Sequence, residues 1–229
     1  LGRSNIPNPV KGAMILVLSF LLYGGTDGVL THEPAFMLEF GFMLIKELMV
    51  GFAIGFSMEL SFAVVRFAAA VLDYIMGLSM AQTYDPQYNT QMTITSGMFY
   101  TFLVLLFLAG DGHVRLMALI YHSARLIPFG EVMIRPELST LMVEIFKTSI
   151  ATGLQLAFPI LAMELVTESA VGILMRIIPQ INVFAVNFQL KIIVGLMMLL
   201  YMFSPIASKM YTIIDNLFLY IEEALRLMV

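Results

Sequence analysis

The stretch GFMLIKELMVGFAIGFSMELSFAVVRFAAAVL, residues 41–72, is apolar along nearly its whole length. Its four charged side chains are Lys46, Glu47, Glu59 and Arg66. Because this run contains no Pro and exceeds the length of an ordinary strand, it predicts one long helix, which we place over residues 36–74. A charged side chain that faces lipid at mid-bilayer costs about 2.5–3.5 kcal/mol. We therefore expect these four charges to face protein or water.

The composition lies outside the range of ordinary soluble domains. Of the 229 residues, 60% are hydrophobic and 12% are charged, and the mean hydropathy is +0.91. Soluble domains are about half apolar and about a quarter charged. Much of the apolar surface must therefore meet a membrane or other apolar subunits. The net charge of −4, without a basic stripe, argues against nucleic-acid binding.

The sequence offers little that could support catalysis or hold a cofactor. It contains no Cys, and its three histidines lack the close spacing of zinc ligands. It also has no phosphate-binding Gly-x4-Gly-Lys-Ser/Thr loop. Glu164 and Glu168 are four residues apart and share one helix face, but no base or metal ligand lies near them in the sequence. We expect a protein that is not an enzyme and that binds neither a cofactor nor a metal ion.

Two interpretations of the charged residues remain open at this point. In the first, the chain is a helical transporter and its charges line a pathway. In the second, the helices are buried chiefly against other subunits. The 19 Met residues favour the second, because thioethers fill adaptable packing surfaces. We predict interhelical or intersubunit pairing, with exposure at an aqueous face as the alternative, for Lys46, Glu47, Glu59, Arg66, Glu164, Glu168 and Arg176.

The pattern is helical from end to end. We predict an all-α fold of an integral-membrane subunit, with long kinked helices, helical hairpins and no β-sheet, in a single domain over residues 1–229. The tight turn at residues 110–113 is expected to close a helical hairpin, and Pro159 to bend a long helix. Besides the helix over 36–74, we predict helices over residues 10–23, 95–109, 114–127, 137–178, 181–207 and 211–228.

Residues 77–93 interrupt the helical pattern. The part GLSMAQTYDPQYN, residues 77–89, loses the apolar character of its neighbours, and its Asp-Pro pair ends a helix. One interpretation is an aqueous loop. The other is a segment held inside a pore or cavity, where irregular backbone is tolerated at membrane depth.

The string PQINVFAVNFQLK, residues 179–191, resembles the signature of the flagellar biosynthetic protein FliR family and of its injectisome counterparts. The signature positions in this chain are Pro179, Gln180, Asn182, Val183, Phe184 and Lys191. Further matching landmarks lie at residues 77–89, 110–113, 126–128, 159–162 and 172–176, so that the resemblance covers about residues 10–207. Departures from the family pattern occur at Tyr84, Asn187 and Gln189, where Phe, Gly and Pro are expected.

The resemblance implies a subunit of the type III protein export gate in the bacterial inner membrane, within the flagellar basal body. One copy is expected to join several FliP and FliQ subunits in a closed helical assembly, with FlhB docked on it and FlhA nearby. Unfolded export substrates would pass through the shared pore. The resemblance also implies that residues 77–89 plug the unloaded channel, with Gly77 as a hinge. The plug residues in this chain are Gly77, Leu78, Met80, Tyr84, Asp85, Pro86 and Tyr88.

Three alternatives compete with this interpretation. An injectisome export subunit is one, although the string NVFAV at residues 182–186 favours the flagellar system. A secondary transporter needs inverted repeats or paired broken helices, and the sequence has no such internal symmetry. A purely structural scaffold should lose little when the loop around Asp85 is removed. Because the chain begins with Leu1, we also expect that a first N-terminal helix is missing from it.

Overall fold

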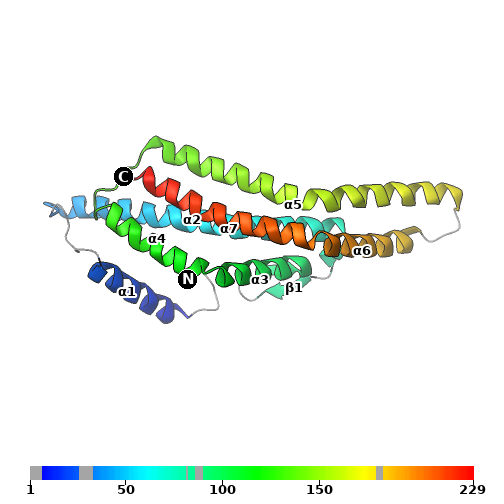
Figure 1. Cartoon of the computed structure of the whole chain (residues 1–229), viewed down its shortest axis with the longest axis horizontal. Helices are drawn as coiled ribbons and strands as arrows, with labels where there is room; N and C mark the ends of the chain where they lie inside the picture. The colour runs from blue at the N-terminus through cyan, green and yellow to red at the C-terminus, as the bar shows by residue number, and fades with distance from the viewer. Residues whose placement is uncertain (1–6, 26–32, 81, 86–89, 179–182) are drawn as a thin grey trace.

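The structure, a computed structural model, describes residues 7–25, 33–80, 82–85, 90–178 and 183–229. In these residues the chain is almost entirely helical and forms an elongated bundle (Figure 1). Its helices are α1 (Asn8–Gly25), α2 (Met37–Ile75), α3 (Ile94–Ala109), α4 (Gly112–Leu126), α5 (Pro136–Ile177), α6 (Val183–Tyr201) and α7 (Phe203–Arg226). The predicted all-α class is confirmed.

Two of the helices are much longer than a membrane is thick. α2 has 39 residues and α5 has 42. At 1.5 Å per residue they measure about 58 and about 63 Å, against about 30 Å for a hydrocarbon core. Pro136 begins α5 at a position where its missing N–H breaks no helical hydrogen bond. Pro159 lies inside α5 without ending it.

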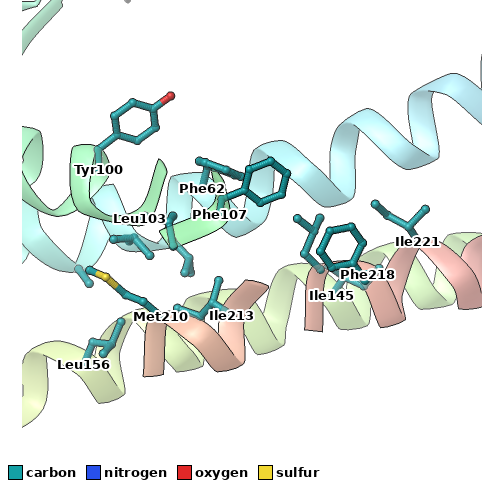
Figure 2. Close-up of a cluster of buried hydrophobic side chains, with 14 of the residues drawn as sticks. Phe62, Tyr100, Leu103, Phe107, Ile145, Leu156, Met210, Ile213, Phe218 and Ile221 are labelled. Carbon is teal, nitrogen blue, oxygen red and sulfur yellow. The ribbon is translucent and has the colours of Figure 1, made fainter. Parts of the chain in front are cut away.

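α2 is the central element of the bundle. It packs against α3, α5 and α7, and the buried side chains of these helices form one cluster (Figure 2). The ring of Phe107 on α3 lies 5.8 Å from that of Phe62 on α2 and 6.2 Å from that of Phe218 on α7. Small side chains at Ala68 and Ala69, both fully buried, allow the neighbouring helices to approach α2 closely.

The predicted hairpin over residues 95–127 is wrong. α3 and α4 meet at a bend of 66°, so that α4 continues away from α3 instead of returning along it (Figure 1). Asp111 makes the break with one residue in the left-handed conformation, at φ 54°. The tight Gly-Asp-Gly turn indicated a reversal, but a single left-handed residue only redirects the helix. Consecutive helices that do run antiparallel and pack against each other are α2 with α3 and α5 with α6 (Figure 1).

The predicted break between the last two helices was placed too late. α6 ends at Tyr201 and α7 begins at Phe203, with a bend of 61° between them. Pro205 accounts for this position, because in a continuous helix its ring would clash with the carbonyl of Tyr201. In the first turn of a new helix the same ring is tolerated.

The expectation of no β-sheet needs one correction. Strands β1 (Gln82–Asp85) and β2 (Thr90–Thr93) pair antiparallel, with Gln82 opposite Thr93 and Asp85 opposite Thr90. A 3-10 helix, η1 (Leu78–Met80), precedes them. Four-residue strands are too short to show the alternation that identifies a strand in a sequence.

Much of the apolar surface is uncovered in the single chain. α1 has no buried residue, and Leu16 and Phe20 are 72% and 77% exposed. Within the described residues, α1, α2 and α5 are long and apolar enough to cross a membrane, and counting each bent pair as one span gives up to five spans.

Candidate functional site

The segment between α2 and α3, residues 76–93, is here called the connecting segment. α2 ends at Ile75, and the chain then turns at Gly77, whose φ of +77° is a conformation that side chains other than Gly rarely adopt. Leu78 in η1 packs against the core of the bundle. The hairpin β1–β2 follows and leads directly into α3. A polar segment thus connects two apolar helices.

A hydrogen bond joins the ends of α2 and α3 on either side of the connecting segment. The backbone N–H of Thr95, in the first turn of α3, donates to Oδ2 of Asp73 on α2 at 3.0 Å. Asp73 is fully buried, and its other oxygen, Oδ1, has no hydrogen-bond partner in the described parts of the chain. A carboxylate at a helix N-terminus satisfies a free N–H and complements the helix dipole. Sequence analysis did not single out Asp73.

The predicted plug residues lie on this segment where the structure describes them. Gly77 follows the C-cap of α2, Leu78 and Met80 begin and end η1, and Tyr84 and Asp85 belong to β1. Pro86 and Tyr88 lie outside the described residues. Phe188 on α6 lies close to the start of the segment. A Cβ atom on Gly77 would lie 3.2 Å from Cε2 of Phe188.

Lys46 and Glu47 hold a turn at the other end of the bundle. The N–H of Gly130 donates to Oε1 of Glu47 at 3.0 Å, and Nζ of Lys46 donates to the carbonyl of Gly130 at 3.5 Å. Gly130, at φ +89°, lies in the connection between α4 and α5. Both charges therefore tie α2 to this connection.

Glu59 and Arg66 form an ion pair at 2.5 Å within α2, not between two helices. The Arg66 guanidinium also lies 5.4 Å from the ring centre of Tyr100 on α3. Glu59 is 64% exposed, and an exposed pair contributes at most about 1 kcal/mol. Arg66 thus reaches α3 through the ring of Tyr100, whereas its pair with Glu59 stays within α2.

The charges of α5 have three different environments. Glu168 accepts a hydrogen bond from Nζ of Lys191 on α6 at 3.0 Å, an ion pair between two helices. Arg176 is exposed in the last turn of α5, with no ion pair among the residues that the structure describes. Glu164 is only 2% exposed, and neither of its oxygens has a hydrogen-bond partner within those same residues.

The family signature spans the entry into α6. Val183 and Phe184 begin the helix, whereas Pro179, Gln180 and Asn182 lie outside the described residues. Lys191 makes the ion pair with Glu168. No group of three or more His, Cys, Asp or Glu side chains that could hold a metal ion occurs within the described ranges.

Comparison with known proteins identifies the family. The model of "Bacterial export proteins, family 1" matches residues 1–217. The chain belongs to this family. The resemblance drawn from residues 179–191 and the other landmarks is thereby confirmed. A family 1 export protein with several long apolar helices is consistent with association with a membrane.

Individual relatives of this family 1 protein carry the name flagellar biosynthetic protein FliR. That of Escherichia coli (strain K12) is 26% identical over 220 residues, which cover 95% of this chain and 84% of the relative. That of Bacillus subtilis (strain 168) is 26% identical over 230 residues, with coverage of 98% and 86%. That of Pectobacterium carotovorum subsp. carotovorum is 29% identical over 191 residues, with coverage of 82% and 73%.

Proposed function

We propose that this export protein is a subunit of the flagellar type III export gate in the bacterial inner membrane. It forms a channel for unfolded export substrates together with FliP and FliQ subunits, and FlhB and FlhA act beside it. Residues 77–89 of the connecting segment plug the unloaded channel. The chain itself is a transport component without catalytic activity.

The observation that carries this proposal is the construction of the connecting segment. It is polar, it leaves α2 at a left-handed glycine, and the helix ends on either side of it are joined by the hydrogen bond between Asp73 and Thr95. These contacts hold both ends of the segment while α2 and α3 stay packed. Family membership supplies the process, protein export, in which a movable closure is needed.

The uncovered apolar surface supports assembly with other helical subunits. Contiguous apolar patches of this extent mark contacts with protein or membrane, and α1 presents such a patch along its whole length. The charged residues on the long helices α2 and α5 make simple exposure of these helices to lipid costly. Partner helices that cover the apolar faces satisfy both constraints.

Removal of the plug tests the closure. We expect deletion of residues 80–88 to raise small-ion conductance severalfold through the complex with FliP and FliQ in planar bilayers. Replacement of the same residues by a Gly/Ser linker of equal length keeps the spacing between α2 and α3 and should give the same increase. Unchanged conductance in both variants would overturn the plug assignment.

Co-purification tests the assembly itself. The chain produced together with FliP and FliQ in mild detergent should elute as one stable mixed complex, much heavier than the chain alone. A monomer or homodimer that is indifferent to these proteins would instead favour a secondary transporter.

A further inference from the structure

Glu164 lacks the partners that a buried carboxyl group normally has. It sits in the middle of α5 at 2% exposure, and both oxygens are without a hydrogen-bond partner within the described part of the chain. Buried carboxyl groups are normally paired or hydrogen-bonded, because leaving them unsatisfied is costly. The carboxylate is therefore in an arrangement that a nearby cation would improve.

Lys191, a cation that acts on Glu164, already has another partner. Lys191 on α6 binds Glu168, which is 56% exposed. Burial disfavours the charged form of Glu164 most strongly, Lys191 favours that form, and Glu168 disfavours it. Glu164 and Glu168 are neighbours on one helix face, four residues and one turn apart. The flexible stem of a lysine can cover this separation.

Met76 lies against Gly195 on α6, beside the Glu164 carboxylate. A Cβ atom on Gly195 would lie 2.4 Å from both Cγ and Sδ of Met76 and 3.0 Å from Oε1 of Glu164. The Met76 thioether and the Glu164 carboxylate therefore meet at the same point of α6, one turn beyond Lys191. Met76 is fully buried.

Met76 is also the first residue of the connecting segment. It caps α2 and precedes the left-handed Gly77. Phe188, one turn before Lys191 on α6, contacts Gly77. Unwinding of the last turn of α2, next to the left-handed Gly77, would move Met76 away from Glu164 and release Phe188 together.

We propose that Lys191 has two alternative carboxylate partners on α5, and that Met76 selects between them. With Met76 in place, as here, Lys191 pairs with Glu168. When Met76 withdraws, the ammonium moves one turn along α5 to Glu164. This inference deepens the proposed function, because the exchange couples the α5–α6 pair to the position of the connecting segment.

Cross-linking in the assembled complex tests the exchange. An apolar carbodiimide joins an amine to a carboxylate in contact with it, and peptide mass spectrometry locates the bond. In the wild-type complex we expect a Lys191–Glu168 product. Met76→Ala should make Lys191–Glu164 the main product, and Met76→Ala combined with Glu164→Gln should lose it. Met210→Ala, which truncates another fully buried Met on α7, serves as the matched control and should retain Lys191–Glu168.

The outcomes distinguish a failure of this inference from a failure of the plug assignment. If Met76→Ala leaves the bond on Glu168, or if Met210→Ala moves it equally, the selection by Met76 is wrong. Glu168→Gln gives a second route, since Lys191 should then link to Glu164 without any change at Met76, and its failure to do so would overturn the alternative pairing. The plug is tested on its own by the conductance of the 80–88 deletion. A shift of the cross-link without a rise in that conductance would contradict the plug and leave the exchange standing.

Discussion

Asp73 is the single residue on which the geometry of the connecting segment depends most directly. Its replacement by Ala removes the acceptor of the Thr95 N–H and leaves that donor buried without a partner. Such a loss costs about 1–3 kcal/mol. We expect Asp73→Ala to lower the denaturation midpoint of the purified chain in detergent, followed by circular dichroism. Asp73→Asn retains a carbonyl oxygen for the same hydrogen bond and should cost less.

An exposed aspartate provides the control for this prediction. Asp215 on α7 is 69% exposed and pairs with Arg115 at 3.5 Å, so that Asp215→Ala should change the stability by less than about 1 kcal/mol. If Asp215→Ala lowered the midpoint as much as Asp73→Ala, the effect at Asp73 could not be assigned to its hydrogen bond.

Sequence analysis could not have found this role for Asp73. Asp73 stands at the end of a long apolar run, and its partner lies 22 positions further along the chain. Only the packing of α3 against α2 brings the two together. The sequence does predict that Glu164 and Glu168 share one helix face, because this follows from the helical period alone. The burial of Glu164 and the pairing of Glu168 with Lys191 depend on the approach of α6, which no local pattern specifies.

At the level of whole elements, the bend between α3 and α4 depends on the absence of a side chain at Gly112. A Cβ atom there would lie 2.5 Å from Cδ2 of Phe107 and 2.7 Å from its carbonyl oxygen. Phe107 is held between Phe62 and Phe218 and cannot yield easily. Overpacking of this kind costs about 1–3 kcal/mol. Gly112→Ala should therefore destabilise the chain, measured as a lower denaturation midpoint.

A second glycine gives the opposite expectation for the same substitution. Gly51 lies inside α2, and no atom would come within 4 Å of a Cβ placed there. Gly51→Ala should stabilise the isolated chain by about 0.5–1 kcal/mol, because Ala loses less backbone entropy in a helix. Equal effects of the two substitutions would show that contact with Phe107 does not govern the bend.

The elements themselves were predictable to different degrees. Long apolar runs predicted α2 and α5 with nearly correct ends, because in runs of this length single residues that disfavour a helix, such as Pro159, do not end it. The junction between α6 and α7 lies earlier than predicted, because Pro205 belongs to the first turn of α7. The direction of α4 was also missed. A turn sequence indicates where a helix ends, but the angle that follows is set by the packing of Phe107 in the core.

For the whole molecule, the distribution of apolar surface favours the proposed assembly with other subunits. The described helices bury one continuous core, yet α1 and the first half of α2 expose large apolar side chains. In a protein that acts alone in lipid, the charges along α2 and α5 would be costly. In an assembly, the exposed apolar faces would contact other subunits, and the buried core of the bundle would hold these faces in position.

Phe20 offers a direct test of this view. It is 77% exposed on α1, so that Phe20→Arg should leave the denaturation midpoint of the isolated chain unchanged within about 0.5 kcal/mol. In the complex, a buried unpaired guanidinium is strongly unfavourable, and we expect Phe20→Arg to abolish co-purification with FliP and FliQ. Thr140→Arg, an exposed polar position on α5, serves as the control and should assemble normally. If Phe20→Arg assembled as well as Thr140→Arg, α1 would not be a subunit contact, and its apolar face would have to be assigned to lipid.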